Sequence, residues 1–321
     1  MIERTALTPL LSPFCLVAAV VVLFPLSLRA SGGSNPPVPY EGGAASTEGQ
    51  ELAPQDQVIL ITGSTGGLGR EVAMVLAGTG AHIIVHGRDQ ERGLEVVEEI
   101  ERGGVGSASF HAADLASFEE VRAFAETILA EYDRLDVLVN NAGIWLDEEE
   151  RILSEDGHEL HLQVNYLSTF LLTHMLLPML EESAPARIVN VSSVAQTPLD
   201  FDDPSMDSGY SDSRAYAQSK LAQVLFTYDL ADALEGTGIS VNALHPATMM
   251  DTGMVLSRGA EPRSSVEEGR DAVVHLVTAP DLGTGQYFVG TRPAEADAQA
   301  YDPAARETLR ELSARVTGLS D

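Results

Sequence analysis

Short apolar runs alternate with longer amphipathic stretches along most of the chain, and this alternation constrains the fold more than any other feature. The runs that predict strands lie at 58–61, 82–85, 107–111, 137–139, 187–191, 239–244 and 286–289. The stretches that predict helices lie at 68–77, 89–102, 117–131, 158–182, 214–234, 266–278 and 303–317. Strands joined through helices of this length pair in parallel, with helices on both faces of the sheet. We therefore predict an α/β fold, a doubly wound parallel sheet in a single domain.

Residues 10–28 carry no charge and differ in composition from the chain that follows. As a helix they would span roughly 28 Å, just enough to cross the hydrocarbon core of a bilayer. Leu28, Arg29 and Ala30 form a poor cleavage site, so residues 1–30 are predicted to be an uncleaved anchor rather than a cleaved signal segment. A third interpretation of residues 1–30 is that the start codon is mis-assigned. Residues 31–56 are rich in Gly, Ser, Pro and Glu, which predicts a flexible linker before a folded domain at 57–321.

The chain is strongly acidic, with 19 Lys and Arg against 48 Asp and Glu and a formal net charge of −29. Nucleic acid is not an expected partner, because binding to phosphate groups needs a basic face. Cys15 is the one cysteine, which excludes an intramolecular disulfide and a metal site built from thiolates. His158 and His161 are three residues apart, but no histidines stand at a convincing spacing from carboxylates, so we predict no metal site.

A glycine-rich segment runs directly from the first predicted strand into the first predicted helix. Its sequence is Thr62-Gly63-Ser64-Thr65-Gly66-Gly67-Leu68-Gly69. Glycines let the backbone approach a pyrophosphate, and a helix N-terminus supplies amide donors and a positive dipole end. The alternative is a tight turn without a ligand. The position of the segment at the start of an alternating domain favours dinucleotide binding and a Rossmann-type sheet.

The chain has a single lysine, Lys220, which lies four residues after Tyr216. Positions i and i+4 lie on the same face of a helix. An ammonium held near a phenol stabilises the phenolate, so we expect the pKa of Tyr216 to lie below its ordinary value near 10. Such a tyrosine could exchange protons near neutral pH. The alternative is that Lys220 has no special role and is the one lysine that by chance was not replaced by arginine.

Together these segments resemble the short-chain dehydrogenase/reductase family. The resemblance covers about residues 56–291, and its motifs follow the family's order and spacing. Tyr216-Ala-Gln-Ser-Lys220 and the residues after it are most similar to the branch that contains retinol dehydrogenases. The matching segments are Thr62-Gly63, Gly67-Leu68-Gly69, Asp114-Leu115, Asn140-Asn141-Ala142-Gly143, Asn165, Val191-Ser192-Ser193, Tyr216, Lys220 and His245-Pro246.

The resemblance implies a catalytic set of Asn165, Ser193, Tyr216 and Lys220. Tyr216 would exchange a proton with the substrate oxygen, and Ser193 would stabilise charge that develops on that oxygen. Lys220 would hold the nicotinamide ribose and tune Tyr216. Asn165 would help to hold a water that links Lys220 to solvent. Ser192 is the neighbouring alternative to Ser193, and either serine could instead be a cap at the end of a strand.

The resemblance also implies a set of residues that bind the cofactor. Asp251 stands where the family usually has a threonine near the carboxamide, so Thr248 is our candidate for that contact. The expected set is Gly63, Ser64, Thr65, Gly67, Leu68, Gly69, Arg88, Asp114, Leu115, Asn141, Ala142, Gly143, Tyr216, Lys220 and Thr248.

The end of the second predicted strand bears on the choice between NADP and NAD. Gly87 and Arg88 occupy the place where an acidic residue would accept from the ribose 2′-hydroxyl of NAD. A guanidinium there suits a 2′-phosphate, which favours NADP. Asp89 is adjacent, so NAD stays an alternative.

We therefore predict an NAD(P)-dependent oxidoreductase, an alcohol dehydrogenase or carbonyl reductase acting on a small, apolar alcohol, aldehyde or ketone. The alternative is a catalytically silent sensor or scaffold that binds the dinucleotide. Trp145 could line the substrate pocket or serve packing alone. The stretch 197–213 holds five aspartates and could form a substrate rim or a solvated loop. A monomer and a homodimer both remain open.

Because NADPH is a cytoplasmic cofactor, we expect an enzyme anchored through residues 10–28 with its catalytic domain facing the cytoplasm. A mis-assigned start would make it a cytoplasmic protein instead, and secretion is disfavoured.

Overall fold

The computed structural model describes residues 56–319. Eight strands form one sheet in the order β3-β2-β1-β4-β5-β6-β7-β8. All neighbouring strands pair in parallel except β7 and β8, which are antiparallel. The strands are β1 (Val58–Ile61), β2 (His82–Gly87), β3 (Ser107–Ala112), β4 (Val137–Asn140), β5 (Ala186–Val191), β6 (Ile239–His245), β7 (Gln286–Val289) and β8 (Arg292–Ala294).

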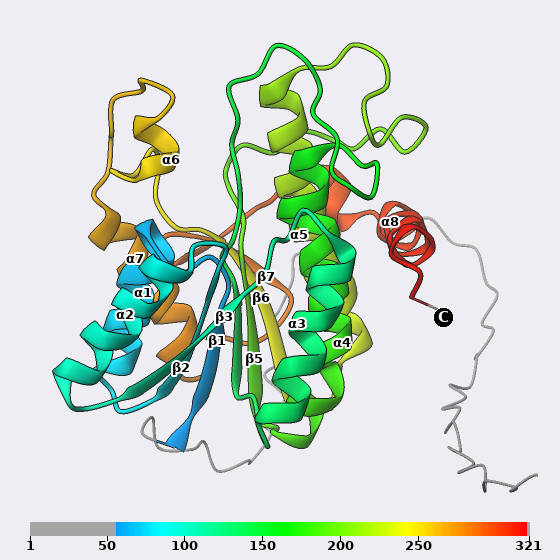
Figure 1. Ribbon diagram of the computed structural model, residues 1–321. Helices are drawn as coiled ribbons and strands as arrows, with labels where there is room; N and C mark the ends of the chain where they lie inside the picture. Colours follow the sequence, from blue (N-terminus) through cyan, green and yellow to red (C-terminus); the bar gives the residue numbers. More distant parts are fainter. Residues whose placement is uncertain (1–55, 320–321) are drawn as a thin grey trace, which may run out of the picture. The chain divides into compact units, whose positions relative to one another are not determined.

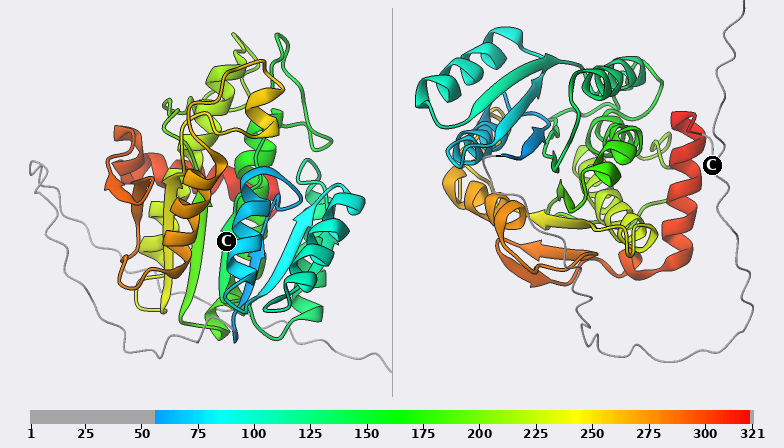
Figure 2. Two further views of the ribbon diagram at one scale, coloured as in Figure 1. Left: turned by 90° about the vertical axis from the view of Figure 1, so that its left-hand side faces the viewer. Right: turned by 90° about the horizontal axis from the view of Figure 1, so that it is seen from below.

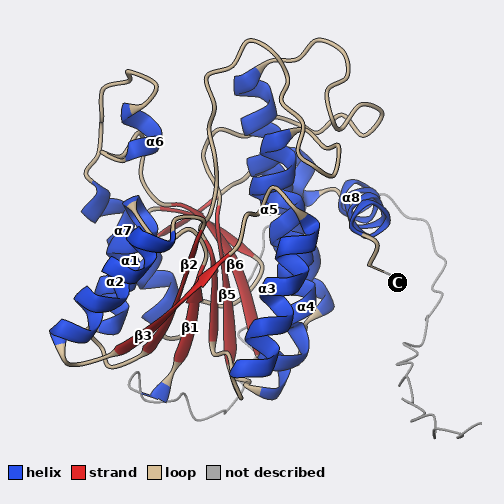
Figure 3. Cartoon of the chain, in the orientation of Figure 1, coloured by secondary structure: helices blue, strands red, loops and turns tan. Residues whose placement is uncertain are grey.

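Helices cover both faces of the sheet (Figure 1 and Figure 3). One face carries α1 (Gly67–Ala77), α2 (Gln90–Gly103) and α7 (Val266–Thr278). The other carries α3 (Phe118–Glu131), the π-helix η2 (Leu162–Leu167), α4 (Ser168–Glu182) and α5 (Asp212–Ala233). Two views in Figure 2 show the last helix, α8 (Pro303–Thr317), alongside these layers, where it packs against α5. The remaining short elements are α6 (Gly253–Leu256) and the 3-10 helix η3 (Ala298–Tyr301).

Alternating side chains of the central strands supply two separate cores. Along β1, Leu60 joins the cluster beneath α3, α4 and α5, whereas Ile59 and Ile61 join the cluster beneath α1 and α7. All three side chains are at most 1% exposed. A strand that is buried on both faces has a continuous apolar sequence, and for this reason the central strands could be predicted.

The predicted fold class is confirmed, and the seven predicted strands and seven predicted helices all form. The sheet is not wholly parallel, since β8 adds an antiparallel edge strand, and neither β8 nor α6 was predicted. The helix expected from residue 158 begins later, because the Glu159 carboxylate accepts from the Leu162 amide at 2.8 Å and residue 159 bridges to Leu153.

The direction of winding reverses between β1 and β4. In open α/β sheets a ligand crevice forms at such a point, outside the carboxyl ends of the strands. The glycine-rich segment follows β1, and Asn141 follows β4, so both lie at this crevice. The topology therefore brings together motifs that are up to about 80 residues apart in sequence, as in the bond from the Ala142 amide to the Thr62 hydroxyl.

Within residues 56–319, no helix is both long enough and apolar enough to span a bilayer. The anchor predicted at 10–28 and the linker predicted at 31–56 fall outside the described residues, except for residue 56.

Candidate active site

A cavity of about 900 Å³ opens at the carboxyl edge of the sheet. Residues that follow β1, β2, β3, β4, β5 and β6 all contribute to its wall, together with α5 and the segment around α6. The volume lies at the upper end of the range usual for sites that bind cofactors and small molecules. All predicted site residues line it except Ser64 and Asn165.

The glycine-rich segment forms the floor of the cavity. Gly63 has a φ of +65° and packs so closely on Ala142 that a Cβ would lie 2.9 Å from the Ala142 Cα. Gly67, at φ +52°, begins α1 and lines the cavity. The N-terminus of α1 therefore lies at the cavity wall, and a helix N-terminus with its amide donors and positive dipole end suits a pyrophosphate. The residues present fit a dinucleotide.

Ser64 was predicted to contact the cofactor, but its side chain points into the protein. Its hydroxyl donates to the Ile61 carbonyl at 2.7 Å and accepts from the His86 amide at 3.1 Å. Ser64 is fully buried and does not line the cavity. Its role is to join the ends of β1 and β2. A serine has no sequence signal that separates these two orientations.

The end of β2 carries a polar recess beside the main cavity, lined by Thr65, Arg88, Asp89 and Arg92. Asp89 caps α2, since its carboxylate accepts from the Arg92 amide at 3.1 Å and pairs with the Arg92 side chain at 3.3 Å. Arg88 lies 3.4 Å from Asp114, with 69% of its side chain exposed. Two guanidinium groups thus border the recess, and the adjacent acid is engaged as a helix cap.

The residues expected on the adenine side also reach the cavity. Asp114 and Leu115 follow β3 and line it, as do Asn141, Ala142 and Gly143 after β4. The Asn141 side chain donates to the Thr62 carbonyl at 2.8 Å, which holds the two strand ends together. These residues therefore shape the cavity through backbone placement.

Tyr216 and Ser193 meet at the inner part of the cavity. Tyr216 lies in the second turn of α5 and Ser193 follows β5, and their side chains share a hydrogen bond. Ser192 is turned away, because its hydroxyl donates to the Lys220 carbonyl at 2.7 Å. The geometry thus places Ser193 beside the phenol and leaves Ser192 bonded to the helix backbone.

Lys220 is 4% exposed and its ammonium lies 5.9 Å from the centre of the Tyr216 ring. The Nζ atom donates to the Val191 carbonyl at 2.9 Å and to the Gln223 side chain at 3.0 Å. Burial lowers the pKa of Lys220 from its ordinary 10.5 to about 7.

The expected low pKa of Tyr216 is not what the structure gives. Burial raises the pKa of the Tyr216 phenol, and only the hydrogen bond with Ser193 opposes this. The reason is that desolvation disfavours the phenolate, while the Lys220 ammonium is directed at Val191 and Gln223. In this arrangement Tyr216 is a neutral acid at physiological pH, suited to donating a proton.

The buried lysine gives stability a pH dependence with a definite sign. Because the pKa of Lys220 is near 7 in the folded chain and 10.5 when unperturbed, the unfolded chain binds more protons between these values. Its contribution to the free energy of unfolding therefore rises from pH 7 toward pH 10, by up to about 1.4 kcal/mol for each unit of pKa difference. Urea unfolding of the wild type and Lys220→Met should show a stability gap that narrows over this range. If the free energies of unfolding of the two proteins changed equally with pH, the lowered pKa of Lys220 would be contradicted.

Asn165 lies within the π-helix η2 and does not line the cavity. Its side-chain oxygen accepts from the Ile144 amide at 2.7 Å, and its amide donates to the Ile144 carbonyl at 3.1 Å and to the Ser219 hydroxyl at 2.9 Å. A Cβ at Gly143 would lie 3.2 Å from the Asn165 oxygen and 3.3 Å from the Lys220 nitrogen. Asn165 therefore positions the chain after β4 beside Lys220.

Thr248 lines the cavity, and its hydroxyl lies 2.9 Å from Nε2 of His245. Burial lowers the pKa of His245 to about 4, so the imidazole is neutral. Thr252 also lines the cavity, whereas Asp251 does not. Thr248 and Thr252 both line the cavity, so both are candidates for the contact with the carboxamide.

The outer part of the cavity is apolar. Trp145 lines it, with its ring 5.4 Å from the Tyr216 ring at an interplanar angle of 31°. None of the five aspartates in the stretch 197–213 lines the cavity. Four of them lie in an exposed or half-exposed loop, in which the Asp203 carboxylate accepts from the Asp207 and Ser208 amides. Asp212 differs, because it begins α5 with a side chain only 10% exposed.

Three residues of the site were missed by the sequence reasoning: Arg92, Gln223 and Arg258. An arginine three residues after Asp89 could have been assigned to the recess from helix geometry. Gln223 lies one turn after Lys220 on the same face. Arg258 had no sequence signal, because it reaches Trp145 from a loop with no family-like pattern. Among residues 56–319, no cluster of His, Cys, Asp and Glu could hold a metal ion.

The chain is similar to known proteins over most of its length. Residues 57–262 match the model of the short chain dehydrogenase family. Human retinol dehydrogenase 14 is 36% identical over 293 residues, covering 82% of this chain and 87% of that protein. Human retinol dehydrogenase 13 is 36% identical over 284 residues, covering 82% of this chain and 85% of that protein.

A solved structure with a related fold holds a nicotinamide cofactor. It is a short chain dehydrogenase from Escherichia coli CFT073, crystallised as a complex with NADPH. The two chains are 29% identical and superpose with a TM-score of 0.60, covering 73% of this chain and 96% of the other.

Proposed function

The chain belongs to the short-chain dehydrogenase/reductase family, and on this premise we propose that Tyr216, Ser193 and Lys220 carry its chemistry with NADP as cofactor. It is an NAD(P)-dependent oxidoreductase that acts on alcohol and carbonyl groups, similar to the retinol dehydrogenase branch. The observation that carries the proposal is the Tyr216–Ser193 pair, with a buried Lys220, at the inner end of a cavity large enough for a dinucleotide.

The glycine-rich segment and Lys220 would hold the nicotinamide cofactor, which would supply or accept the hydride of the substrate carbon. Ser193 donates a hydrogen bond to the substrate oxygen and fixes its position beside Tyr216. In reduction, the Tyr216 hydroxyl gives its proton to that oxygen as charge develops on it, so that an alcohol forms. Lys220 supplies positive charge near the phenolate that is left, which would otherwise be costly in a buried site. In oxidation, the same groups take the proton back.

The polar recess at the end of β2 supports NADP over NAD. Arg88 and Arg92 border it, and the one acid at the strand end, Asp89, caps α2. Guanidinium groups bind phosphate through charge-assisted hydrogen bonds, whereas a ribose 2′-hydroxyl would need a free carboxylate at this place.

Removing the two guanidinium groups should therefore change cofactor preference. We expect Arg88→Ala combined with Arg92→Ala to raise the KM for NADPH by about tenfold to a hundredfold and to leave the KM for NADH nearly unchanged. Initial rates at varied cofactor concentration measure this. Arg102→Ala, at the other end of α2, is the matched control. An equal loss with both cofactors would show that the recess does not read the 2′-phosphate.

The substrate is proposed to be an apolar primary alcohol or its aldehyde, of the retinoid type. Two observations support this: relatives that bear the name retinol dehydrogenase, and an outer cavity lined by Trp145, Leu146, Val194, Met254 and Val255. Beside these apolar side chains, Ser213, Thr252 and Arg263 also line the cavity.

The test is a screen of the purified full-length protein against aldehydes and ketones of graded length and polarity, with NADPH and NADH side by side. Consumption of NADPH at 340 nm should be fastest with long apolar aldehydes. Tyr216→Phe, purified in the same way, controls for contaminating reductases. A protein that binds NADPH but turns over no compound better than Tyr216→Phe would instead fit a dinucleotide sensor or scaffold.

We also propose that residues 10–28 anchor the enzyme in a membrane, with residues 31–56 as a linker and the domain from residue 57 in the cytoplasm. The uncharged stretch supports an anchor, and the need for NADPH supports this orientation. Protease treatment of intact and permeabilised cells tests it, because the domain should be digested only after permeabilisation. Recovery of a processed soluble form outside the cells would contradict the anchor.

A further inference from the structure

We propose that Arg258 is a positioning residue for the substrate pocket: it ties a loop tip to Trp145 and Asp212 and thereby holds the indole against Tyr216. The inference rests on the proposed function, because it concerns the tyrosine to which we assign the proton transfer. Arg258 is not among the residues that line the cavity, so it acts through the residues it holds.

The segment between β6 and α7 is a loop closed at its base. The Arg263 amide donates to the Met249 carbonyl at 2.8 Å, the Asp251 amide donates to the Ser264 carbonyl at 3.2 Å, and Met250 bridges to Ser264. The tip, residues 253–262, contains α6 and projects beyond the carboxyl edge of the sheet (Figure 1). Val255 points inward and is 5% exposed, whereas Leu256 is 53% exposed.

Arg258 provides the polar attachment of this tip. Its guanidinium donates to the Asp212 carboxylate at 3.0 Å and pairs with Asp147 at 3.2 Å. The same group lies over the Trp145 ring, 4.0 Å from its centre. Among the described residues, no other side chain of 253–262 makes a hydrogen bond or ion pair with the rest of the protein. With 13% of its side chain exposed, Arg258 is largely shielded from water.

Both main partners of Arg258 support Tyr216. The Trp145 ring lies 5.4 Å from the Tyr216 ring at a tilt of 31°, so the indole contacts both the guanidinium and the phenol. Asp212 lies four residues before Tyr216 on α5 and therefore on the same face of the helix. A shift of the tip would move the substrate-facing indole and the first turn of α5 together.

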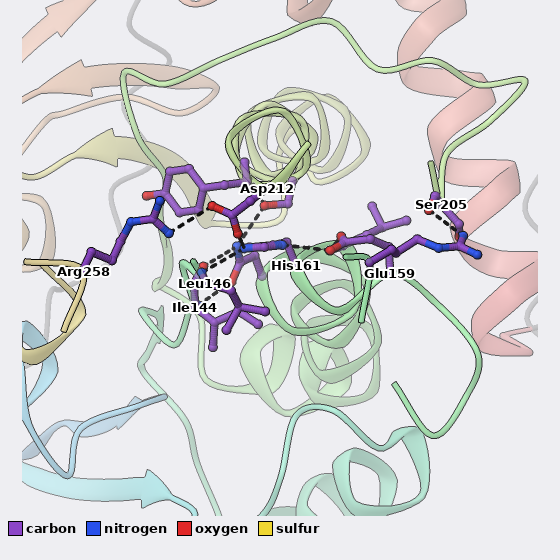
Figure 4. A network of polar contacts seen from close by, with 12 residues as sticks. Ile144, Leu146, Glu159, His161, Ser205, Asp212 and Arg258 are labelled. Atoms are coloured by element: carbon purple, nitrogen blue, oxygen red, sulfur yellow. Dashed lines mark hydrogen bonds and ion pairs between the residues drawn. The ribbon is translucent and has the colours of Figure 1, made fainter. Parts of the chain in front are cut away.

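The Asp212 carboxylate depends on Arg258 for its counter-charge (Figure 4). His161 lies 3.4 Å from the other Asp212 oxygen, but its Nε2 accepts from the Leu146 amide at 3.1 Å. The His161 proton is thus on Nδ1, where it is shared with Glu159 at 2.8 Å. The Asp212 oxygen that faces His161 is buried and has no hydrogen-bond partner among the described residues.

This arrangement requires an arginine. A planar guanidinium can bond Asp212 and Asp147 at its edge while its face lies on the indole, and an ammonium cannot do both. Loss of the side chain would leave a largely buried carboxylate without a counter-charge, which is among the more disruptive changes a protein site can undergo.

Trp145 is the one tryptophan of the chain, so its fluorescence reports on the contact directly. We compare the wild type, Arg258→Met, Arg258→Lys and Arg306→Met in the full-length protein. Arg306 is the matched control, because its side chain is 15% exposed and pairs with Asp232 at 2.8 Å on the far side of α5. Acrylamide quenching of Trp145 should increase by about twofold in Arg258→Met once the covering guanidinium is gone, and should not change in Arg306→Met.

Kinetics form the second arm. For a long apolar aldehyde, Arg258→Met should lower kcat/KM by about tenfold to a hundredfold, mainly through KM, while the dissociation constant of NADPH stays within about twofold of wild type. Arg258→Lys keeps a positive charge for Asp212 but loses the stacking on the indole, so it tests the stacking alone and replaces Arg258→Met if that variant does not fold. Its kcat/KM should lie between those of Arg258→Met and the wild type.

Unchanged quenching, or a kinetic loss no greater than that of Arg306→Met, would overturn the inference. So would full activity of Arg258→Lys. If the wild type turns over no compound, the proposed function fails. The quenching of Trp145 in Arg258→Met still tests the inference in that case, because an increase over the wild type supports the contact and an unchanged value contradicts it.

Discussion

Replacing Tyr216 with Phe should lower kcat/KM for carbonyl reduction by about a thousandfold or more, since a positioned proton donor contributes roughly 10² to 10⁴ to the rate. The hydroxyl sits in the inner cavity, shares a hydrogen bond with Ser193 and has its pKa raised by burial, so the proton it supplies is not easily replaced by water. Initial rates with NADPH and the best aldehyde of the screen measure the effect. NADPH binding, followed by its fluorescence, should stay within about twofold, because the phenyl ring keeps the packing.

Tyr228→Phe is the matched control. Tyr228 lies on the same helix, α5, is 7% exposed and stacks near Tyr301 on the side of α8. Its loss should leave kcat/KM within about twofold of wild type. Comparable activity of Tyr216→Phe and Tyr228→Phe would remove Tyr216 from the reaction.

Lys220→Arg should lower kcat/KM by about a hundredfold although it keeps the positive charge. The ammonium fits a tight place, bonded to Val191 and Gln223, where even a Cβ at Gly143 would lie 3.3 Å from it. A guanidinium is larger and planar, and it cannot deprotonate, whereas the pKa of Lys220 is near 7. Rates measured from pH 6 to pH 9 should show a flatter profile in the variant over the range in which Lys220 titrates.

Lys220→Met provides the comparison for the charge itself. It keeps the length and apolar stem of the side chain and removes the ammonium, so it should lose at least as much activity as Lys220→Arg. An arginine variant with wild-type rates would show that charge alone suffices at this position.

The sheet and its helices could be predicted because each central strand is buried on both faces. Leu60 and its neighbours Ile59 and Ile61 are all apolar for that reason, and the glycines after them are required by backbone contacts such as Gly63 on Ala142. The pairing of Ser193 with Tyr216 followed from the family motifs, since the topology returns both residues to one edge of the sheet.

Other features depended on three-dimensional surroundings that no local pattern encodes. Burial raises the pKa of Tyr216 and outweighs the opposing hydrogen bond with Ser193. Ser64 turns inward because the His86 amide needs an acceptor. The contact of Arg258 with Trp145 joins two loops that are 113 positions apart, each without regular periodicity. These three features depend on contacts between distant parts of the chain, so the sequence alone could not predict them.

The docking of α8 has a consequence for how the protein is made. Ser313 bonds the buried Tyr166 hydroxyl at 2.6 Å, and Arg122 bonds the Thr317 carbonyl, across 147 and 195 positions of sequence. Protein domains fold as they emerge from the ribosome, N-terminal parts first. Because α8 also packs against α5, the helix that carries Tyr216 and Lys220 is not fully covered until α8 has left the exit tunnel. A nascent chain stalled before residue 303 would display an apolar flank of α5, the kind of surface that chaperones bind.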